Sequence, residues 1–421
     1  MKQILIIGNS AAGISCAEAI REYDQTSKIV MLSDEDTPSY YRCLISYYLA
    51  GDVKKNNLVY KPQKFYSDRN IELVLNKKVV RVNTKKNRIF CEDKSTYDYD
   101  ILVIASGARA HIPEIKGVRK KSVFVFRSLN DVKEIESLLP ITKTACVLGG
   151  GLVGIKAAYA LRRRNVEVKV LVKSNQILSQ VLDADAAFLV QKKLEENGIE
   201  ILLGQDADEI IGEGDIRAVK ISSGKIFGCS LVVLGKGVEP AVDYIEESDI
   251  KVNYGIVGNE FMRSSVPNVF TAGDVCESLD ICREKNAVNA LWPVAVEQGR
   301  CAGLNIAGHT TVYPGSFGMN STDFFGLPVV SLGLHKIEKD AQGLDECKVF
   351  DAAQGTYKKI IFRGDRIVGA IFVGTIGASG IFTRLIKEQV NISSVRDKLL
   401  EDTFGYPDIS GLVQEKEQSY V

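Results

Sequence analysis

The sequence lacks a surplus of charge of either sign. Its 421 residues include 53 Lys and Arg and 53 Asp and Glu, so the formal net charge is +0. Proteins that bind nucleic acid or anionic lipid through electrostatic attraction need a positive surface, so the balance of charges argues against both kinds of partner. Hydrophobic residues make up 45% and charged residues 25% of the chain, which is typical of globular proteins. We therefore expect an ordinary folded protein of about three domains, with no nucleic-acid partner.

The sequence also lacks a long hydrophobic run. The first ten residues, MKQILIIGNS, contain a short apolar run, but Gly8, Asn9 and Ser10 end it before a signal-peptide core forms. The longest uncharged stretch, 367–382, is shorter than the roughly 20 residues of a membrane-spanning helix, and four glycines interrupt it. We expect no membrane span and interpret the first run as a buried strand.

Closely spaced cysteines and histidines are missing as well. The nine cysteines are scattered, without a CxxC pair or a zinc or iron–sulfur spacing, and only three histidines are present. The sequence therefore predicts neither a metal site nor a serine-type hydrolase triad. An odd, dispersed set of cysteines suits reduced thiols, so we expect a cytoplasmic protein.

What the sequence does contain is an internal repeat. ILIIGNSAAGISCAEAI, from Ile4, and ACVLGGGLVGIKAAYAL, from Ala145, each place a glycine-rich turn between an apolar run and a helical pattern. A second apolar run follows each copy, from Lys28 and from Val166, and completes a βαβ unit of about thirty residues. The repeat predicts two dinucleotide-binding units.

The spacing of the small residues indicates what the turns bind. The first glycine of such a turn allows a tight bend, the middle residue must be small so that a pyrophosphate can approach the backbone, and the last glycine lets helix and strand pack closely. The helix N-terminus then offers free N–H groups to the phosphates. The first turn supplies Gly8, Ser10 and Gly13, and the second supplies Gly149, Gly151, Leu152, Val153 and Gly154.

Around this repeat the sequence resembles the two-dinucleotide-binding-domain flavoproteins, the pyridine nucleotide-disulfide oxidoreductase family. Four segments carry the resemblance, in the family's order: 97–113, 234–240, 266–277 and 291–299. The resemblance implies an α/β fold with two Rossmann-like domains, for FAD and for NAD(P), and a C-terminal α+β domain. The implied domains are 1–112 and 241–312 for FAD, 113–240 for NAD(P) and 313–421 for the C-terminal interface domain.

The resemblance further implies FAD and NAD(P)H as cofactors. In the family an aspartate matching Asp274 hydrogen-bonds the ribityl chain of FAD, and a helix start matching Ala295 offers N–H groups to the flavin. An acid after the second strand accepts ribose hydroxyls, and in the first unit this is Asp34 or Glu35. Further cofactor contacts are implied for Arg42, Val79, Ala105, Ser106, Gly107, Gly237 and Gly273.

The choice between NADH and NADPH stays open in the sequence. The second unit has Val172-Lys173-Ser174 where an acid would accept the ribose of NADH and repel the phosphate of NADPH. The missing acid permits NADPH, and Lys173 is a candidate contact for its phosphate.

Two interpretations of the electron acceptor stay open, because members of the family differ in it. Cys43 falls where NADH oxidases and coenzyme A-disulfide reductases keep one redox cysteine. A low-pKa thiolate beside Arg42 would make the chain a reductase of coenzyme A disulfide, polysulfide or oxygen species. The run from Tyr40 to Ser46 also resembles rubredoxin and ferredoxin reductases and the flavin domain of NADH-dependent nitrite reductase, which pass electrons to a separate iron–sulfur or rubredoxin-type protein. Leu44 and Ala11 replace a glycine and a histidine of the thiol branch, so we favour the separate protein.

Further expectations concern Lys156, the C-terminal part and the oligomeric state. Lys156 stands where many relatives carry a glutamate near the nicotinamide, so it either alters hydride approach or reaches solvent. Gly364-Asp365 between two apolar runs predicts a hairpin, and 381–390 has helical spacing. The resemblance makes a homodimer an expectation, and the polar tail 415–421 is predicted to be mobile.

Overall fold

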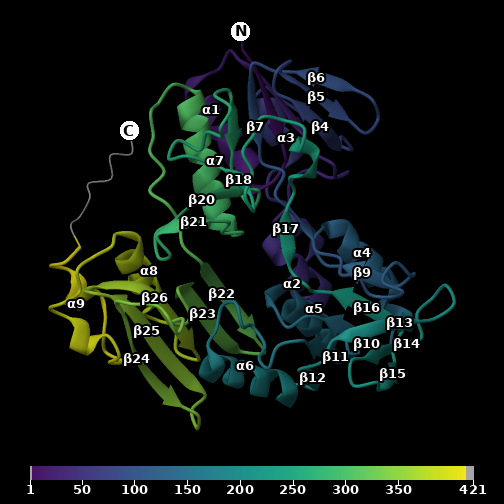
Figure 1. Cartoon of the computed structure of the whole chain (residues 1–421), viewed down its shortest axis with the longest axis vertical. Helices are drawn as coiled ribbons and strands as arrows, with labels where there is room; N and C mark the ends of the chain where they lie inside the picture. Colours follow the sequence, from purple (N-terminus) through teal and green to yellow (C-terminus); the bar gives the residue numbers. More distant parts are fainter. Residues whose placement is uncertain (1, 414–421) are drawn as a thin grey trace.

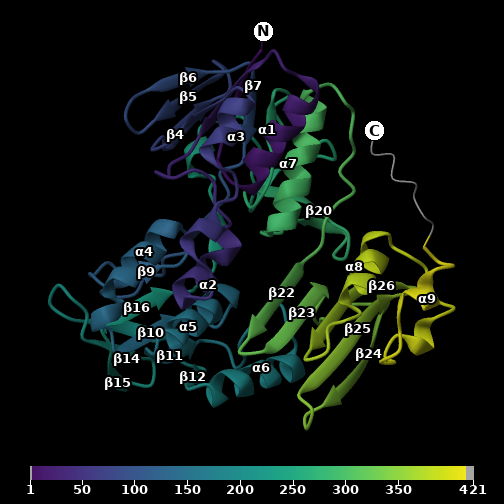
Figure 2. The ribbon, with the colours of Figure 1, turned by 180° about the vertical axis from the view of Figure 1, so that it is seen from behind.

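The computed structural model describes residues 2–413, so the predicted mobile tail lies outside it. Figure 1 and, from behind, Figure 2 show three parts: one at the top, one with α5 and β10, and one with the antiparallel sheet β22–β26. No helix within residues 2–413 is long and apolar enough to cross a membrane.

The first part is built on a parallel sheet with strand order β19-β7-β1-β2-β3. The strands are Val269–Thr271, Ile101–Ile104, Gln3–Ile7, Lys28–Leu32 and Ile71–Val74 in that order. Apolar residues such as Leu5 and Val103 are buried in it because both faces are covered. The helices of this part are α1 (Ala11–Tyr23), α3 (Gln63–Asp68) and α7 (Trp292–Ile306). The short helix α2 (Ile45–Ala50) comes from the same stretch of chain but packs against the second part (Figure 1). Because β19 and α7 come late in the chain, this part is assembled from two separate stretches.

The second part repeats the plan with strand order β12-β11-β10-β16-β9, again parallel. The strands are Ile199–Leu203, Glu167–Val172, Thr144–Leu148, Leu231–Leu234 and Val123–Val125. Its helices are α4 (Leu129–Leu138), α5 (Leu152–Arg163) and α6 (Ala184–Glu196). A capping box between Ser128 and Asp131 starts α4, which satisfies N–H groups of its first turn.

Smaller sheets and turns complete these two parts. Each carries a three-stranded sheet: β4 (Val79–Asn83), β5 (Arg88–Cys91) and β6 (Thr96–Asp98) in the first, and β13 (Ala207–Ile211), β14 (Ala218–Ile221) and β15 (Ile226–Gly228) in the second. β18 (Ile256–Val257), β20 (Cys276–Asp280) and β21 (Lys285–Ala287) form another. The chain passes between the two parts along β8 (Ala108–Ala110) and returns along β17 (Val238–Pro240), and these strands pair with each other. Single 3₁₀ turns span η1 (Arg42–Leu44), η2 (Lys55–Leu58), η3 (Leu139–Ile141) and η4 (Asp243–Ile245).

The C-terminal part is an antiparallel sheet with order β22-β23-β26-β25-β24. Its elements are β22 (Met319–Phe324), β23 (Leu327–Gly333), β24 (Leu344–Asp351), β25 (Thr356–Arg363), β26 (Arg366–Val373), α8 (Ser379–Lys387), η5 (Arg396–Lys398) and α9 (Tyr406–Ile409). The predicted hairpin is confirmed, since Gly364-Asp365 joins β25 to β26, and α8 confirms the predicted helix.

The predicted fold class is confirmed: two Rossmann-like parallel sheets and a C-terminal α+β part. The domain boundaries at residues 112, 240 and 312 stay predictions. One large apolar cluster continues from the second part into the C-terminal sheet, where Phe324, Tyr357 and Ile371 belong to it. These two parts therefore share a core.

Candidate functional site

The first glycine turn lies between β1 and α1 and leaves no room for a side chain at its two glycines. Gly8 has φ +117°, and a Cβ there would lie 2.1 Å from the Ala105 carbonyl oxygen. A Cβ on Gly13 would lie 2.0 Å from the Gly8 oxygen. Ser10 is the N-cap of α1 but makes no side-chain cap hydrogen bond. The first N–H groups of α1 are thus left without a side-chain cap, as an anion site at a helix N-terminus requires.

The second glycine turn, between β10 and α5, has the same geometry. Gly149 has φ +121°, and a Cβ there would lie 2.3 Å from the Gly235 oxygen, while a Cβ on Gly154 would lie 2.0 Å from the Gly149 oxygen. Gly151 differs, because no atom lies within 4 Å of the Cβ it would carry. Packing inside the chain does not require glycine at 151, but close approach of a pyrophosphate would. Leu152 and Val153 then form the open first turn of α5, which has no side-chain cap.

A shelf of small side chains surrounds the first turn, formed by Ala11, Ala12, Ala105, Ala272 and Ala295. Ala295 is on the first turn of α7, and Gly273 follows β19 with φ +82°, close to Ala12. Asn9, inside the turn, is only 8% exposed, and its Nδ2 has no hydrogen-bond partner within residues 2–413. A dinucleotide over this shelf fits both the small side chains and the unpaired amide.

The two acids after β2 have different surroundings. Glu35 is held inside the chain, because it pairs with Arg42 and accepts a hydrogen bond from the Tyr40 hydroxyl at 2.7 Å. Asp34 is exposed and is therefore the freer of the two carboxylates for ribose hydroxyls. Val79, at the start of β4, points its side chain into a buried core, which leaves its backbone for a cofactor contact.

The residues after β7 line the crossover between the parallel sheets. Ser106 Oγ donates to the Ala241 oxygen at 3.2 Å and accepts from the Tyr244 hydroxyl at 2.9 Å. Gly107 (φ +71°) and Gly237 (φ +96°) both have the left-handed backbone that favours glycine. Hydrogen bonds between its two strands of chain therefore fix the crossover beside the first turn.

Asp274 pairs with Arg127, a residue that our sequence analysis missed. The Arg127 Nη2 lies 2.7 Å from Asp274 Oδ2, and its Nε donates to the Ala108 oxygen at 3.2 Å. Arg127 belongs to the second part and Asp274 to the first, so the pair joins the two parts. The available signal was the capping box at Ser128, which places residue 127 at the entrance of a helix but does not indicate its partner.

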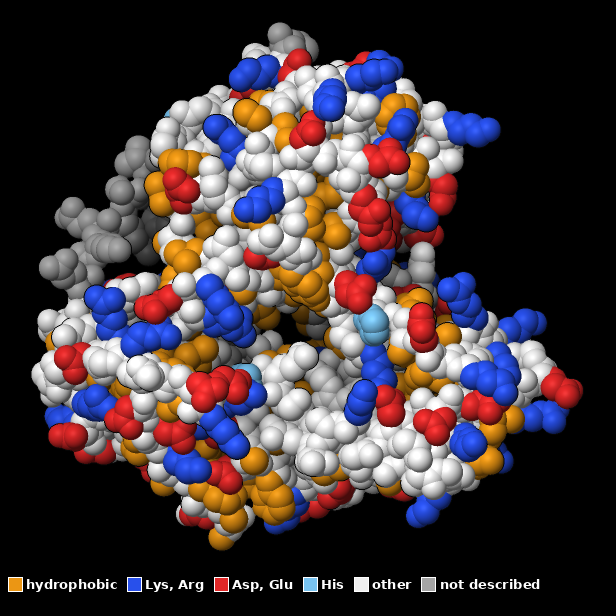
Figure 3. Space-filling model, viewed as in Figure 1, with side chains coloured by type: hydrophobic (Ala, Val, Ile, Leu, Met, Phe, Trp, Pro, Cys, Tyr) orange, Lys and Arg blue, Asp and Glu red, His pale blue; other side chains and the backbone are white. Residues whose placement is uncertain are grey.

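Three aromatic side chains gather at the N-terminus of α7, and these too were missed. The ring centroids of Tyr41, Tyr60 and Trp292 lie 5.0 to 5.4 Å apart, and all three residues are half-buried. Trp292 also packs against the shelf. In Figure 3 a hollow lies in the middle of the face, between the lower end of α7 and the sheet of β22 and β23, with hydrophobic side chains on its rim.

The surroundings of Cys43 disfavour the low-pKa thiolate that the second interpretation of the acceptor requires. Cys43 is exposed at η1, but partial burial of the thiol raises its pKa. Arg42 does not offset this effect, because its guanidinium pairs with Glu35 and donates to the Arg127 carbonyl at 3.4 Å. The charge that lowers the Cys43 pKa comes instead from Lys156.

Lys156 packs beside the short helix α2. It is half-buried on α5, with Nζ 3.4 Å from the Tyr47 hydroxyl and 4.6 Å from the centre of the Tyr47 ring. The side chain therefore faces α2 and Cys43 rather than simply reaching solvent. Lys173, in contrast, is exposed immediately after β11, where a coenzyme ribose is expected.

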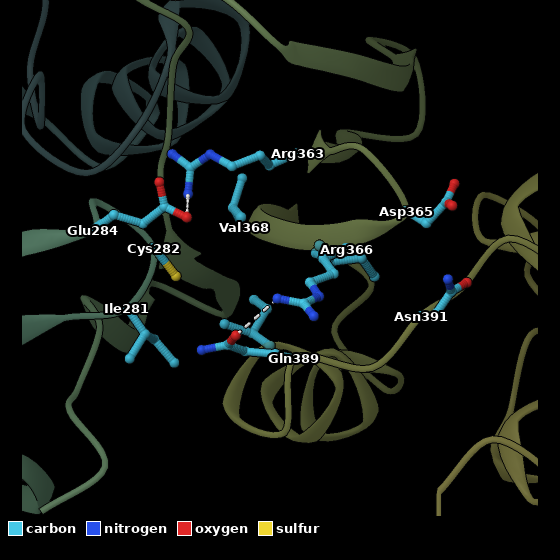
Figure 4. Close-up of a pocket in the computed structure, with 11 residues that line it drawn as sticks. Ile281, Cys282, Glu284, Arg363, Asp365, Arg366, Val368, Gln389 and Asn391 are labelled. Atoms are coloured by element: carbon cyan, nitrogen blue, oxygen red, sulfur yellow. Dashed lines mark hydrogen bonds and ion pairs between the residues drawn. The ribbon is translucent and has the colours of Figure 1, made fainter.

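Two cavities lie away from the glycine turns. One of about 480 Å³ lies where Ser179–Val181, Val288–Leu291 and β23 meet. The other, of about 320 Å³, lies between Ile281–Cys282 and the β25–β26 hairpin (Figure 4). In it Arg363 forms an ion pair with Glu284 at 3.2 Å and Arg366 donates to Gln389 at 3.1 Å, so each cation has a partner within the chain. Within residues 2–413 no group of three or more His, Cys, Asp and Glu is arranged to hold a metal ion.

Comparisons with known proteins agree with this geometry. The family model "Pyridine nucleotide-disulphide oxidoreductase" matches residues 2–299, and "Rubredoxin NAD+ reductase C-terminal domain" matches 319–390. An NADH oxidase of Methanocaldococcus jannaschii is 31% identical over 88% of this chain and 87% of its own. The assimilatory nitrate reductase electron transfer subunit of Bacillus subtilis is 30% identical over 97% of this chain, which spans about half (52%) of that relative.

A solved structure is similar as a whole. The NAD-dependent persulfide reductase from A. fulgidus superposes with a TM-score of 0.87 and 25% identity, over 96% of this chain and 80% of the other. With two matching glycine turns, a shelf of small residues and a model match over residues 2–299, this chain belongs to the pyridine nucleotide-disulphide oxidoreductase family, whose members use FAD and NAD(P)H.

Proposed function

We propose that this chain passes electrons from NAD(P)H, by way of FAD, to a separate iron–sulfur or rubredoxin-type protein. The observation that carries the proposal is the chemistry of the cysteines. Cys43 has a raised pKa, and every cysteine is free, with seven of the other eight buried. A buried neutral thiol is inert, so the chain offers no dithiol to hold an electron pair. The electrons must then leave to an acceptor outside the chain.

The cofactors would be held by the two turns. FAD fits the first turn, with Asp34 toward the adenosine ribose and Asp274 with Arg127 toward the ribityl chain. NAD(P)H fits the second turn, with Lys173 at its adenosine end. When bound, FAD supplies a hydride acceptor that can release electrons singly. The N-terminus of α7 adds the positive end of its dipole, which favours negative charge nearby.

The aromatic group of Tyr41, Tyr60 and Trp292 is the contact surface that we propose for the acceptor. Its rings pack on the shelf at one side and are partly exposed at the other. Half-exposed aromatic residues are frequent anchors of protein interfaces. The match of residues 319–390 to a domain named for rubredoxin reductase, and the name of the Bacillus subtilis relative, support a protein acceptor.

The test compares acceptors in two variants. Wild type, Cys43→Ser and Trp292→Ala are supplied with NADH or NADPH and assayed with a dye, a rubredoxin and a [2Fe–2S] ferredoxin. We expect Cys43→Ser to stay within about twofold of wild type throughout. We expect Trp292→Ala to keep dye reduction and to lose roughly tenfold with a protein acceptor, as interface anchors do. Loss of protein reduction in Cys43→Ser with dye activity preserved would refute the proposal.

A second candidate is a Cys43-dependent reductase of coenzyme A disulfide, polysulfide or oxygen species. The observation that favours it is the exposed position of Cys43 near the ammonium group of Lys156, which partly offsets the rise in the pKa of Cys43 that burial causes. The similarity to a persulfide reductase supports it as well. Its test is turnover of coenzyme A disulfide or polysulfide, which Cys43→Ser must abolish.

Two finer points are also proposals. A cytoplasmic location is supported by the nine free cysteines, which suit a reducing compartment. A homodimer rests on the family resemblance alone, and sedimentation of the purified protein tests it.

A further inference from the structure

The loop from Lys173 to Asp183, between β11 and α6, contacts the second glycine turn. The Leu178 N–H donates to the Gly150 carbonyl at 2.7 Å. Leu178 is 2% exposed and has φ +52°, a left-handed backbone that is unfavourable for a bulky residue. Such strain persists only where the surrounding structure holds the residue in place.

The anchors come from the C-terminal sheet. His335 Nε2 lies 3.1 Å from the Ser179 carbonyl oxygen. Ser331 on β23 donates to the Val181 carbonyl. Both contacts fall within three residues of Leu178, so the loop is fixed to the C-terminal part on the side away from the glycine turn.

The strongest anchor is a buried ion pair at the end of the loop. Asp183 Oδ1 accepts from the Ala186 N–H at 3.1 Å and so caps α6. Its Oδ2 accepts from the Tyr357 hydroxyl at 2.5 Å and lies 3.1 Å from Lys359 Nζ. Lys359 is 5% exposed and also pairs with Glu346 at 2.8 Å. Removing one partner leaves a charge buried without compensation, which is costly.

We propose that the C-terminal part sets the affinity for NAD(P)H by holding this loop through Asp183, Tyr357 and Lys359. The inference rests on the proposed function, because it takes the second turn as the coenzyme site. With the anchor intact, Leu178 stays against Gly150 and Lys173 stays at the end of β11. Without it, the strained backbone at Leu178 relaxes and this wall of the site moves. Tyr357 and Lys359 are therefore positioning residues for the coenzyme.

The experiment removes the contacts of Asp183 with Tyr357 and Lys359, here called the anchor, and measures the mobility of the loop. Tyr357→Phe removes one hydroxyl, and Lys359→Met removes the buried ammonium group. The matched control is Lys348→Met. It breaks the ion pair between Lys348 Nζ and Asp185 Oδ2, which is 2.8 Å long, joins the same two parts and is more exposed to solvent. Amide hydrogen exchange in segment 174–182 is measured in the FAD-loaded protein, together with the KM and kcat for NADH and NADPH with a dye.

We expect faster exchange in segment 174–182 for both anchor variants, and no change for Lys348→Met. The KM should rise roughly tenfold, the effect of losing a hydrogen bond to a charged group, while kcat stays within about twofold and FAD stays bound. Unchanged exchange in Tyr357→Phe, which conserves the fold, would overturn the inference. Faster exchange with an unchanged KM would overturn it too, whereas the role of the second turn itself is tested separately by Gly149→Ala. If the wild type reduces neither a rubredoxin nor a ferredoxin while the anchor variants still show faster exchange and a raised KM with the dye, only the proposed acceptor is refuted.

Discussion

The two glycine turns have nearly the same backbone and different surroundings. Gly8 and Gly149 have φ of +117° and +121°, and in both turns the last glycine has its missing Cβ 2.0 Å from the first glycine's oxygen. The first turn, however, is covered by α7, which approaches α1 so closely that a Cβ on Gly299 would lie 2.2 Å from the Ala12 oxygen. The second turn is bordered by the strained loop that ends at Asp183.

This difference teaches how one motif serves two cofactors. The backbone solves the shared problem, which is a pyrophosphate at a helix N-terminus. Side chains provide the differences between the two turns: Asp34 and Glu35 follow β2, whereas Lys173 follows β11. Tight helix packing around the first turn suits a cofactor that stays bound, and a loop held by another part of the molecule suits a coenzyme that exchanges.

The largest effect should come from adding a methyl group to the first glycine of each turn. Gly8→Ala and Gly149→Ala each place a Cβ within 2.3 Å of a carbonyl oxygen at positive φ, which costs at least about 1–3 kcal/mol. We expect Gly8→Ala to lose FAD. We expect Gly149→Ala to remain yellow but to lose at least about tenfold in kcat/KM for NAD(P)H.

Absorbance of the purified proteins and steady-state kinetics check these outcomes. Gly151→Ala separates the two causes, because its Cβ meets no protein atom and any loss of coenzyme affinity there would come from the pyrophosphate alone. If Gly149→Ala instead loses FAD and keeps coenzyme kinetics, the assignment of the turns is reversed.

A somewhat smaller effect is expected at the ion pair between Arg127 and Asp274, which joins the first two parts. Arg127→Met leaves Asp274 without its cation at 2.7 Å. If the pair holds FAD, the dissociation constant for FAD should rise roughly tenfold, as expected for a charge-assisted hydrogen bond. Titration of the apoprotein with FAD measures it, and an unchanged constant would remove Arg127 from the site.

Reversing the charge after β11 should change coenzyme preference. Lys173→Glu removes a candidate phosphate contact and adds an acid that accepts ribose hydroxyls. The ratio of kcat/KM for NADPH to that for NADH should fall about tenfold. The exposed Lys192 on α6 provides a control charge reversal, and an equal shift in Lys192→Glu would mean that only net charge matters.

The smallest effect concerns the reactivity of the Cys43 thiol. Burial raises the Cys43 pKa above its ordinary 9.0, so the thiol is protonated at neutral pH and alkylation by iodoacetamide should quicken only as pH rises toward and beyond that value. Lys156→Met removes the cation that lowers this pKa, so alkylation at pH 8 should slow by roughly two- to fivefold. A fast reaction at pH 7 in wild type would contradict this result.

Local patterns in the sequence were sufficient for the turns and elements but not for contacts between distant residues. The turn at Gly149 and the hairpin at Gly364 were predictable because each depends on a few neighbouring residues with fixed backbone requirements. Arg127 was missed because its partner Asp274 is far along the chain. The sequence likewise does not show that Arg42, the expected neighbour of the Cys43 thiol, pairs with Glu35.

The central claim, that electrons pass from the second turn to the first and then out of the chain without stopping at a thiol, is tested most directly by an anaerobic titration. The FAD-loaded protein is titrated with NADH and then NADPH, and electron uptake is counted while the flavin spectrum is recorded. The account predicts uptake of one hydride per flavin and no long-wavelength band. Uptake of a further electron pair, or a thiolate-to-flavin band, would contradict it and make Cys43 a redox centre.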